Sequence, residues 1–271
     1  MGRPLNTYDD IAIATIVVFS LYLVGAIILC ARHGFVKSTG WRFLIILALA
    51  RLIGSALLLA TVNDPTNENL YIGWATLNGL GLGPLVLMLM GLLGRVFDSI
   101  NRQGHVVVTP LFRHLLEVLM IVGMILLIVG GTESDFTVVD GEPKVVYSGV
   151  SRGGTGVFVA VTALLCLEAL FAFRNQGYVA QGEHRIIIAI IICLPFVIVR
   201  LVYACIVVLG GVLTTKWEYL GMLVIMEMIV VLICEILGFT LDKAPPKPQG
   251  DPGMQSQPQP RSRHRRRRHR L

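Results

Sequence analysis

Charged residues are scarce in this sequence, and their scarcity sets its class. Asp, Glu, Lys and Arg make up 15% of the 271 residues, whereas a soluble domain carries about a quarter. Apolar residues make up 55%, and the mean hydropathy is +0.73. A chain with so little charge cannot cover a soluble surface, so we expect it to fold within lipid. The predicted fold class is an all-α polytopic membrane protein.

Features of secreted and metal-dependent proteins are also missing. No Asn-x-Ser/Thr sequence for N-glycosylation occurs. None of the six histidines lies inside a predicted span, which excludes a haem held by two histidines and argues against an intramembrane zinc site. We therefore expect no metal, no cofactor and no catalytic residue. No pair of cysteines lies in an outer loop where a disulfide would form, because all five fall in apolar runs: Cys30, Cys166, Cys193, Cys205 and Cys234.

Signatures of known seven-span proteins are absent as well. The seventh apolar run has no lysine, which excludes a Schiff base to retinal. The third run ends Gly94-Arg-Val-Phe-Asp98 instead of the Asp-Arg-Tyr triplet of rhodopsin-like receptors, and no paired-Asp motif for prenyl diphosphates occurs.

Seven apolar runs are present, each near the length of about 20 residues that crosses a hydrocarbon core. They cover residues 11–31, 43–62, 70–93, 115–131, 153–173, 186–208 and 218–241, the fourth being the shortest and weakest. The predicted organisation is an outer N-terminus (1–10), a seven-helix transmembrane domain (11–243) and a basic tail (244–271).

The distribution of Lys and Arg orients these spans, because basic residues favour cytosolic loops. The first, third and fifth connections hold eight, and the opposite side holds four together with most of the loop acids. We therefore expect the N-terminus outside or in a lumen and the C-terminus in the cytosol of an unspecified membrane.

The tail from residue 244 onward is rich in Pro, Gln, Gly and Ser, and it carries seven Arg between positions 261 and 270. Such a composition predicts disorder. Anionic lipid headgroups would attract it by about 1 kcal/mol per basic residue; the alternative is a topology or trafficking signal. We expect no nucleic-acid partner.

The longest outer loop predicts a β-hairpin. Between residues 136 and 148, two runs rich in β-branched residues flank Asp140-Gly141, a favoured hairpin turn. The hairpin would cap the outer mouth, either as a ligand lid or only to satisfy its own backbone.

Matching motifs in the first three and the last three spans predict an internal repeat. Arg51-Leu-Ile corresponds to Arg200-Leu-Val, and Gly94…Asp98 corresponds to Gly238…Asp242, in the same order. Two parallel three-helix units joined by the fourth span would give a 3+1+3 arrangement, which in transporters forms a midplane site. Chance similarity between apolar helices is the alternative.

Charged residues inside the spans are the candidate site, because a charge at bilayer depth costs about 2.5 to 3.5 kcal/mol and needs a partner. Arg200 and Glu227 lie at the same depth, roughly 21 Å from the inner helix ends, which predicts a pair. Arg51 lies between the levels of Glu227 and Glu235, and Glu168 lies nearer the cytosol. Three acids face two cations, so one Glu is expected to be protonated or to exchange a proton.

Glycine and proline mark the third and sixth spans. Next to Asn78, a polar candidate for the same site, Gly79 and Gly83 predict close helix contact. Pro84 predicts a kink, as does Pro195 five residues before Arg200. Broken helices beside polar residues are typical of midplane sites; close packing alone is the other interpretation.

Several motifs together resemble a family of fungal seven-span proteins catalogued as an integral membrane domain of unknown function. They are Arg32-His-Gly34-Phe35, Arg51-Leu-Ile-Gly54, Gly91-Leu-Leu-Gly94-Arg95, Asp98-Ser-Ile-Asn101, Gly130-Gly131 and Leu194-Pro195-Phe196, over residues 8 to 242. The resemblance implies the seven-span architecture and a fungal source, and it implies no activity.

The leading interpretation is a non-enzymatic protein that binds or moves a lipophilic or amphipathic small molecule among membrane lipids. The candidate binding residues are Arg51, Asn78, Glu168, Arg200, Glu227 and Glu235. Three alternatives stay open: a structural ion-pair network, a seven-span receptor or sensor, and a membrane-bound cyclase of the terpene type, in which a carboxylic acid would protonate an epoxide or alkene.

Overall fold

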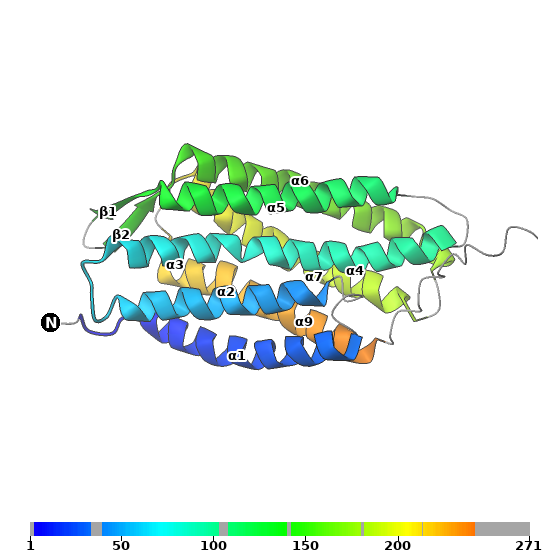
Figure 1. Cartoon of the computed structure of the whole chain (residues 1–271), viewed down its shortest axis with the longest axis horizontal. Helices are drawn as coiled ribbons and strands as arrows, with labels where there is room; N and C mark the ends of the chain where they lie inside the picture. Colours follow the sequence, from blue (N-terminus) through cyan, green and yellow to red (C-terminus); the bar gives the residue numbers. More distant parts are fainter. Residues whose placement is uncertain are drawn as a thin grey trace, which may run out of the picture.

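Seven helices long and apolar enough to cross a membrane run side by side through the structure (Figure 1). This computed structural model describes residues 3–33, 40–102, 108–139, 142–179, 182–212 and 214–241. The predicted seven-helix, all-α bundle is confirmed, while the tail from residue 244 lies outside the described residues. Four spans are single helices: α1 (Thr7–His33), α2 (Trp41–Ala60), α5 (Pro110–Thr132) and α6 (Gly149–Arg174).

The other three spans are composite. The third joins α3 (Glu68–Leu80) to α4 (Leu82–Arg102). The sixth joins α7 (His184–Ala204) to the π-helical segment η2 (Cys205–Leu209). The seventh joins α8 (Lys216–Glu218), the π-helical segment η3 (Tyr219–Ile225) and α9 (Met226–Thr240). A 3-10 turn, η1 (Gln176–Tyr178), lies between α6 and α7.

The predicted hairpin is present. Strands β1 (Asp135–Val139) and β2 (Glu142–Val146) pair antiparallel, with Val139 opposite Glu142. The predicted turn residues, Asp140 and Gly141, lie outside the described residues. The strands contact α3 and lie at the same end of the bundle as the N-terminal residues (Figure 1). We call this end the hairpin end and the other the opposite end.

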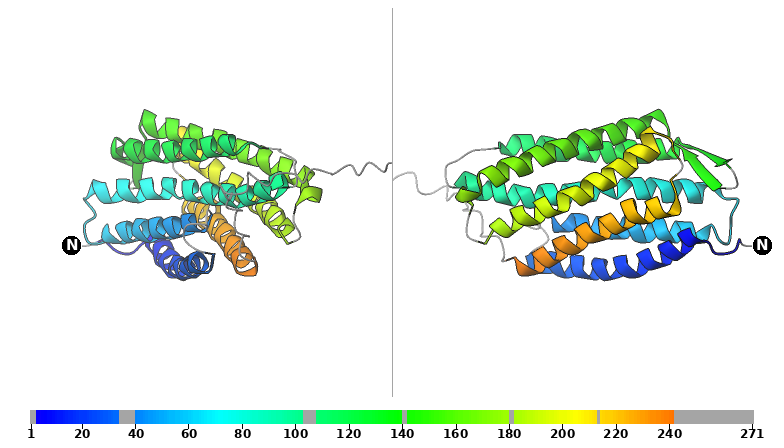
Figure 2. Two further views of the ribbon diagram at one scale, coloured as in Figure 1. Left: turned by 45° about the vertical axis from the view of Figure 1, so that its right-hand side comes forward. Right: turned by 180° about the vertical axis from the view of Figure 1, so that it is seen from behind.

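Consecutive spans pack against one another in a closed ring, and the third span is set furthest toward the inside of the bundle. Each span contacts the next, and α1 contacts α9 to close the ring. The third span also contacts α6 and α7 and runs between the other helices in Figure 2. Of its most apolar stretch, 83% is buried. A polar side chain on the third span can therefore reach partners on several others.

The outward faces of the spans are apolar, as a lipid environment requires. Leu21 on α1 is 69% exposed, and Ile188 and Ile236 on the sixth and seventh spans are 55% and 56% exposed. A soluble protein rarely exposes so continuous an apolar surface. The fold and its surface define a multi-pass membrane protein.

Two spans differ from the sequence expectation. The third extends to Asn101 instead of ending near residue 93, because Val96, Phe97 and Ile100 continue its buried stripe at helical spacing. The fourth has 23 residues and is longer than the 20-residue α2, so it is not the shortest. Thr109, whose hydroxyl accepts from Phe112 N, starts it earlier than its apolar run suggests.

Candidate functional site

A buried ion pair lies near the middle of the second span. Arg51 of α2 is 3% exposed, and Glu227 of α9 is fully buried. Arg51 Nε donates to Glu227 Oε1 over 2.8 Å, and Arg51 Nη2 donates to Oε2. A guanidinium and a carboxylate bind most strongly in this two-pronged arrangement. Arg51 lies about 15 Å along α2 from Trp41 and about 14 Å from Ala60.

Arg200 of α7 adds a second cation to the same carboxylate. It is 1% exposed, and its Nε lies 3.5 Å from Glu227 Oε2. Its Nη2 donates to the backbone carbonyl of Asn78, whose side-chain oxygen accepts from Arg51 Nη1. The predicted pairing of Arg200 with Glu227 is present. We call Arg51, Asn78, Arg200 and Glu227 the central cluster; they come from the second, third, sixth and seventh spans.

Gly81, the residue between α3 and α4, leaves room for the side chains of the central cluster because it has no side chain of its own. A Cβ atom at this position would lie 2.9 Å from Glu227 Oε1 and 3.0 Å from Arg51 Nη2. Pro84, in the first turn of α4, has no N–H to donate to the carbonyl of Leu80, which weakens the helical ladder at this point. The prediction for Gly83 agrees with its tight contact to Met124, but Gly79 has nothing within 4 Å of its Cβ position, so its predicted close contact is wrong.

The sixth and seventh spans also depart from regular α-helix close to the central cluster. Pro195 lies inside α7 ahead of Arg200, and the π-helical segment η2 follows Ala204. In the seventh span, the π-helical segment η3 ends two residues before Glu227. Wide turns of this kind leave backbone groups less well paired and are frequent at functional sites.

Aromatic side chains border the cluster toward the hairpin end. Tyr8, Trp74 and Tyr219 contact one another, with ring centroids 5.6 to 6.2 Å apart. Tyr203 presents its ring to the Arg200 guanidinium at 5.9 Å, a cation–π contact. Tyr147, just after β2, lies within electrostatic range of Arg200; burial raises the pKa of its phenol well above the ordinary value, Tyr203 adds to the rise and Arg200 opposes it.

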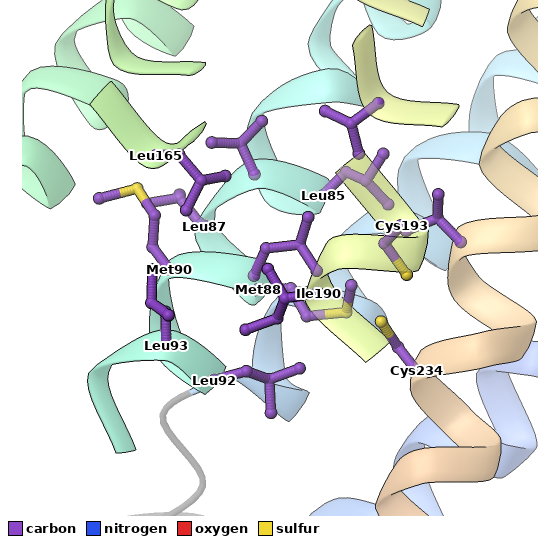
Figure 3. Packing of buried hydrophobic residues seen from close by; sticks show 14 of the residues in the cluster. Leu85, Leu87, Met88, Met90, Leu92, Leu93, Leu165, Ile190, Cys193 and Cys234 are labelled. Atoms are coloured by element: carbon purple, nitrogen blue, oxygen red, sulfur yellow. The ribbon is translucent and has the colours of Figure 1, made fainter. Parts of the chain in front are cut away.

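An apolar layer lies beyond the cluster toward the opposite end. Figure 3 shows Leu85, Met88 and Leu92 of α4 packed near side chains of the sixth and seventh spans. Ile190 and Cys193 come from α7 and Cys234 from α9, and all six residues are at most 3% exposed. The cysteines are free thiols. The central cluster is therefore separated from the opposite end by close-packed apolar side chains.

The two remaining candidates, Glu168 and Glu235, are buried outside the central cluster. Both Glu235 carboxylate oxygens lie 2.8 Å from the Cβ position of Gly25 on α1, so the carboxyl group faces the first span. Glu168 lies on α6 within electrostatic range of Arg113, which forms its own contacts to Asp98 and to the carbonyl of Gly94. One oxygen of each glutamate has no hydrogen-bond partner. Two acids, not one, are thus without a paired cation among the described residues.

Sequence reasoning missed Gly81, the π-helical segments and the aromatic residues around the cluster. The Gly79-Leu-Gly81-Leu-Gly83 run contained the signal for Gly81, but periodicity alone does not tell which glycine faces the charges. Within the described residues, no group of three or more His, Cys, Asp or Glu side chains is arranged to hold a metal ion.

The buried charges, the irregular helices and the apolar surface belong to a multi-pass membrane protein with a polar centre. The family described as a domain of unknown function (DUF7702) matches residues 5–244, and the chain belongs to this family. No curated protein is significantly similar to the chain.

Proposed function

We propose that the protein binds or translocates a lipophilic or amphipathic small molecule whose polar group docks at the central cluster. The observation that carries this proposal is the coincidence of three buried charged residues and the half-buried Asn78 with irregular helix geometry in three of the spans that supply them. Buried charges are expensive in a membrane and tend to mark ligand or ion paths. Interrupted helices beside them supply backbone groups for a ligand.

The proposed orientation follows from the charge bias of the loops: the hairpin end faces outside or into a lumen, and the tail lies in the cytosol. A ligand would then approach past the aromatic residues of the hairpin end. The apolar layer beyond the cluster would have to open for translocation. We also propose a fungal source, from the motif resemblance, and contact of the Arg-rich tail with anionic lipid headgroups.

A receptor or sensor is the second candidate, and the apolar layer favours it. A ligand held above a closed layer can change helix packing without crossing the membrane. The cyclase alternative has less support, because both Glu227 oxygens are already engaged as hydrogen-bond acceptors of Arg51. Glu168 and Glu235 lie apart from it, so no pair of carboxyl groups faces a common site in the described residues.

Native mass spectrometry of protein released from a mild detergent tests the proposal. We expect a bound lipophilic or amphipathic mass that survives gentle activation. Gly81→Ala should lose this mass, because its methyl group would occupy the space of the cluster, and Gly79→Ala should keep it. Protein that carries no such mass, and that takes up none of a panel of added amphiphiles, would contradict the proposal.

A further inference from the structure

The charges of the central cluster do not balance. Arg51 and Arg200 are cations, and Glu227 is the carboxylate that lies within 4 Å of each among the described residues. Both Glu227 oxygens accept from Arg51. The described part of the cluster therefore carries one excess positive charge in the interior of the bundle, where an uncompensated charge is costly.

Arg200 is the incompletely satisfied partner. Its Nε is buried and makes no hydrogen bond to any residue that the structure describes, since the nearest Glu227 oxygen is 3.5 Å away with unsuitable geometry. Its Nη2 donates to a neutral backbone carbonyl of Asn78 instead of a charged group. A guanidinium with an N–H that lacks a partner binds carboxylate and phosphate groups in preference to neutral oxygens.

The surroundings of Arg200 suit the remainder of an amphipathic anion. Tyr203 lies against its guanidinium, and Tyr147, whose phenol is a neutral O–H donor at physiological pH, lies within electrostatic range of Arg200. Next to these lies an apolar cluster separate from the main core, formed by Ile11, Tyr203, Tyr219, Leu223 and Val224. An acyl or isoprenoid chain would find apolar contacts there.

We infer that the ligand of the central cluster is an amphipathic anion, a long-chain molecule whose carboxylate or phosphate group binds Arg200. This inference rests on the proposed function and narrows it to one chemical class. The anion would neutralise the excess charge and accept from Arg200 Nε, while the Arg51–Glu227 pair stays intact.

A matched series of probes tests the inference on the full-length protein in detergent. The probes are oleic acid, 1-oleoyl lysophosphatidic acid, oleyl alcohol and the short anions acetate and inorganic phosphate, with affinity measured by calorimetric titration. We expect one or both long-chain anions to bind at least tenfold more tightly than oleyl alcohol and than either short anion. Which of the two binds more tightly identifies the headgroup.

Arg200 variants assign the preference to this side chain. Arg200→Gln should lower the affinity for the long-chain anion at least tenfold and leave the affinity for oleyl alcohol unchanged. Arg200→Lys should retain part of the preference for the anion over the alcohol. Arg113→Gln, which removes an arginine outside the cluster, should keep it. If Arg200→Gln does not fold, the comparison between Arg200→Lys and the unaltered protein carries the test.

The contrary outcomes are distinct. Equal affinity for oleic acid and oleyl alcohol would overturn the anion inference and leave the proposed function standing. Short anions binding as tightly as long-chain ones would overturn the amphipathic ligand and the proposed function with it. A preference that survives both Arg200→Gln and Arg200→Lys unchanged would place the anion elsewhere and overturn the assignment to Arg200.

Discussion

Glu227 neutralises charge from two arginines, whereas Glu235 has no cation within 4 Å among the described residues. The two acids lie eight positions apart on α9 and are both buried, so they form a matched pair. Removing the charge of Glu227 leaves two buried cations without a counterion. Removing that of Glu235, whose carboxyl group faces the first span, leaves no cation unpaired among the described residues.

We therefore expect Glu227→Gln to lower the free energy of unfolding by about 3 to 5 kcal/mol, the usual cost of breaking a buried ion pair. Glu235→Gln should change it by less than about 1 kcal/mol, because an amide of similar size replaces an unpaired acid. Unfolding of both variants in mixed micelles, followed by circular dichroism, measures the difference. Equal losses would show that Glu235 has a partner of comparable strength.

A charge exchange distinguishes a shared carboxylate from an isolated pair. If Arg200 and Glu227 formed a pair by themselves, the double variant Arg200→Glu with Glu227→Arg would recover stability. Because Arg51 also binds Glu227, the exchange would place two cations side by side. We expect the double variant to be no more stable than Glu227→Gln in the same unfolding assay. Recovery to within about 1 kcal/mol of the unaltered protein would contradict the sharing.

Helix depth predicted part of this arrangement and not the rest. Counting residues from the helix ends placed Arg200 and Glu227 at one level, and they do meet. The same count left Arg51 between Glu227 and Glu235, because it gives height along a helix and not the direction in which a side chain points. The rotation of α9 decides between them: Glu227 faces α2 and Glu235 faces α1.

At the scale of elements, the interruptions in three spans are the feature that apolar patterning did not predict. Hydropathy identifies an apolar run that is long enough to cross a membrane. It does not distinguish a π-helical segment from an α-helix, because the two have the same composition. The segments η2 and η3 were therefore not predicted from the apolar runs of the sixth and seventh spans. The boundary between α3 and α4 at Gly81 was closer to prediction, since glycine and proline are both present there, and Gly81 packs against Arg51 and Glu227.

Alanine at two neighbouring glycines separates the effect of space from that of helix propensity. Gly79→Ala should be neutral or should stabilise by up to about 1 kcal/mol, because alanine favours helix and nothing lies within 4 Å of its Cβ position. Gly81→Ala gains the same propensity but displaces Glu227 and Arg51, and we expect a net loss of about 1 to 3 kcal/mol. Chemical unfolding of the two variants measures the contrast, and equal behaviour would mean that the cluster relaxes without cost.

At the scale of the whole molecule, the closed ring brings together residues that are far apart in the sequence. Arg51 and Arg200, the residues that correspond in the predicted repeat, both reach Glu227. The 3+1+3 repeat itself stays a prediction. The ring also gives the bundle two unlike ends: aromatic side chains and the hairpin at one, and the apolar layer between the cluster and the other.

Function depends on which of these ends faces the cytosol, and the absence of native N-glycosylation sequences makes the orientation simple to measure. The double variant Asp140→Asn with Glu142→Thr creates a glycosylation sequence at the hairpin. Gly177→Thr creates one at Asn175, and nothing lies within 4 Å of the Cβ position of Gly177, so the threonine has room. Glycans are added only on the lumenal side of the membrane, so in a eukaryotic host the hairpin variant should gain a glycan that glycosidase removes. The Gly177→Thr variant should gain no glycan.

The reverse pattern would place the hairpin end, with its aromatic residues, on the cytosolic side. A ligand of Arg200 would then have to enter from the cytosol.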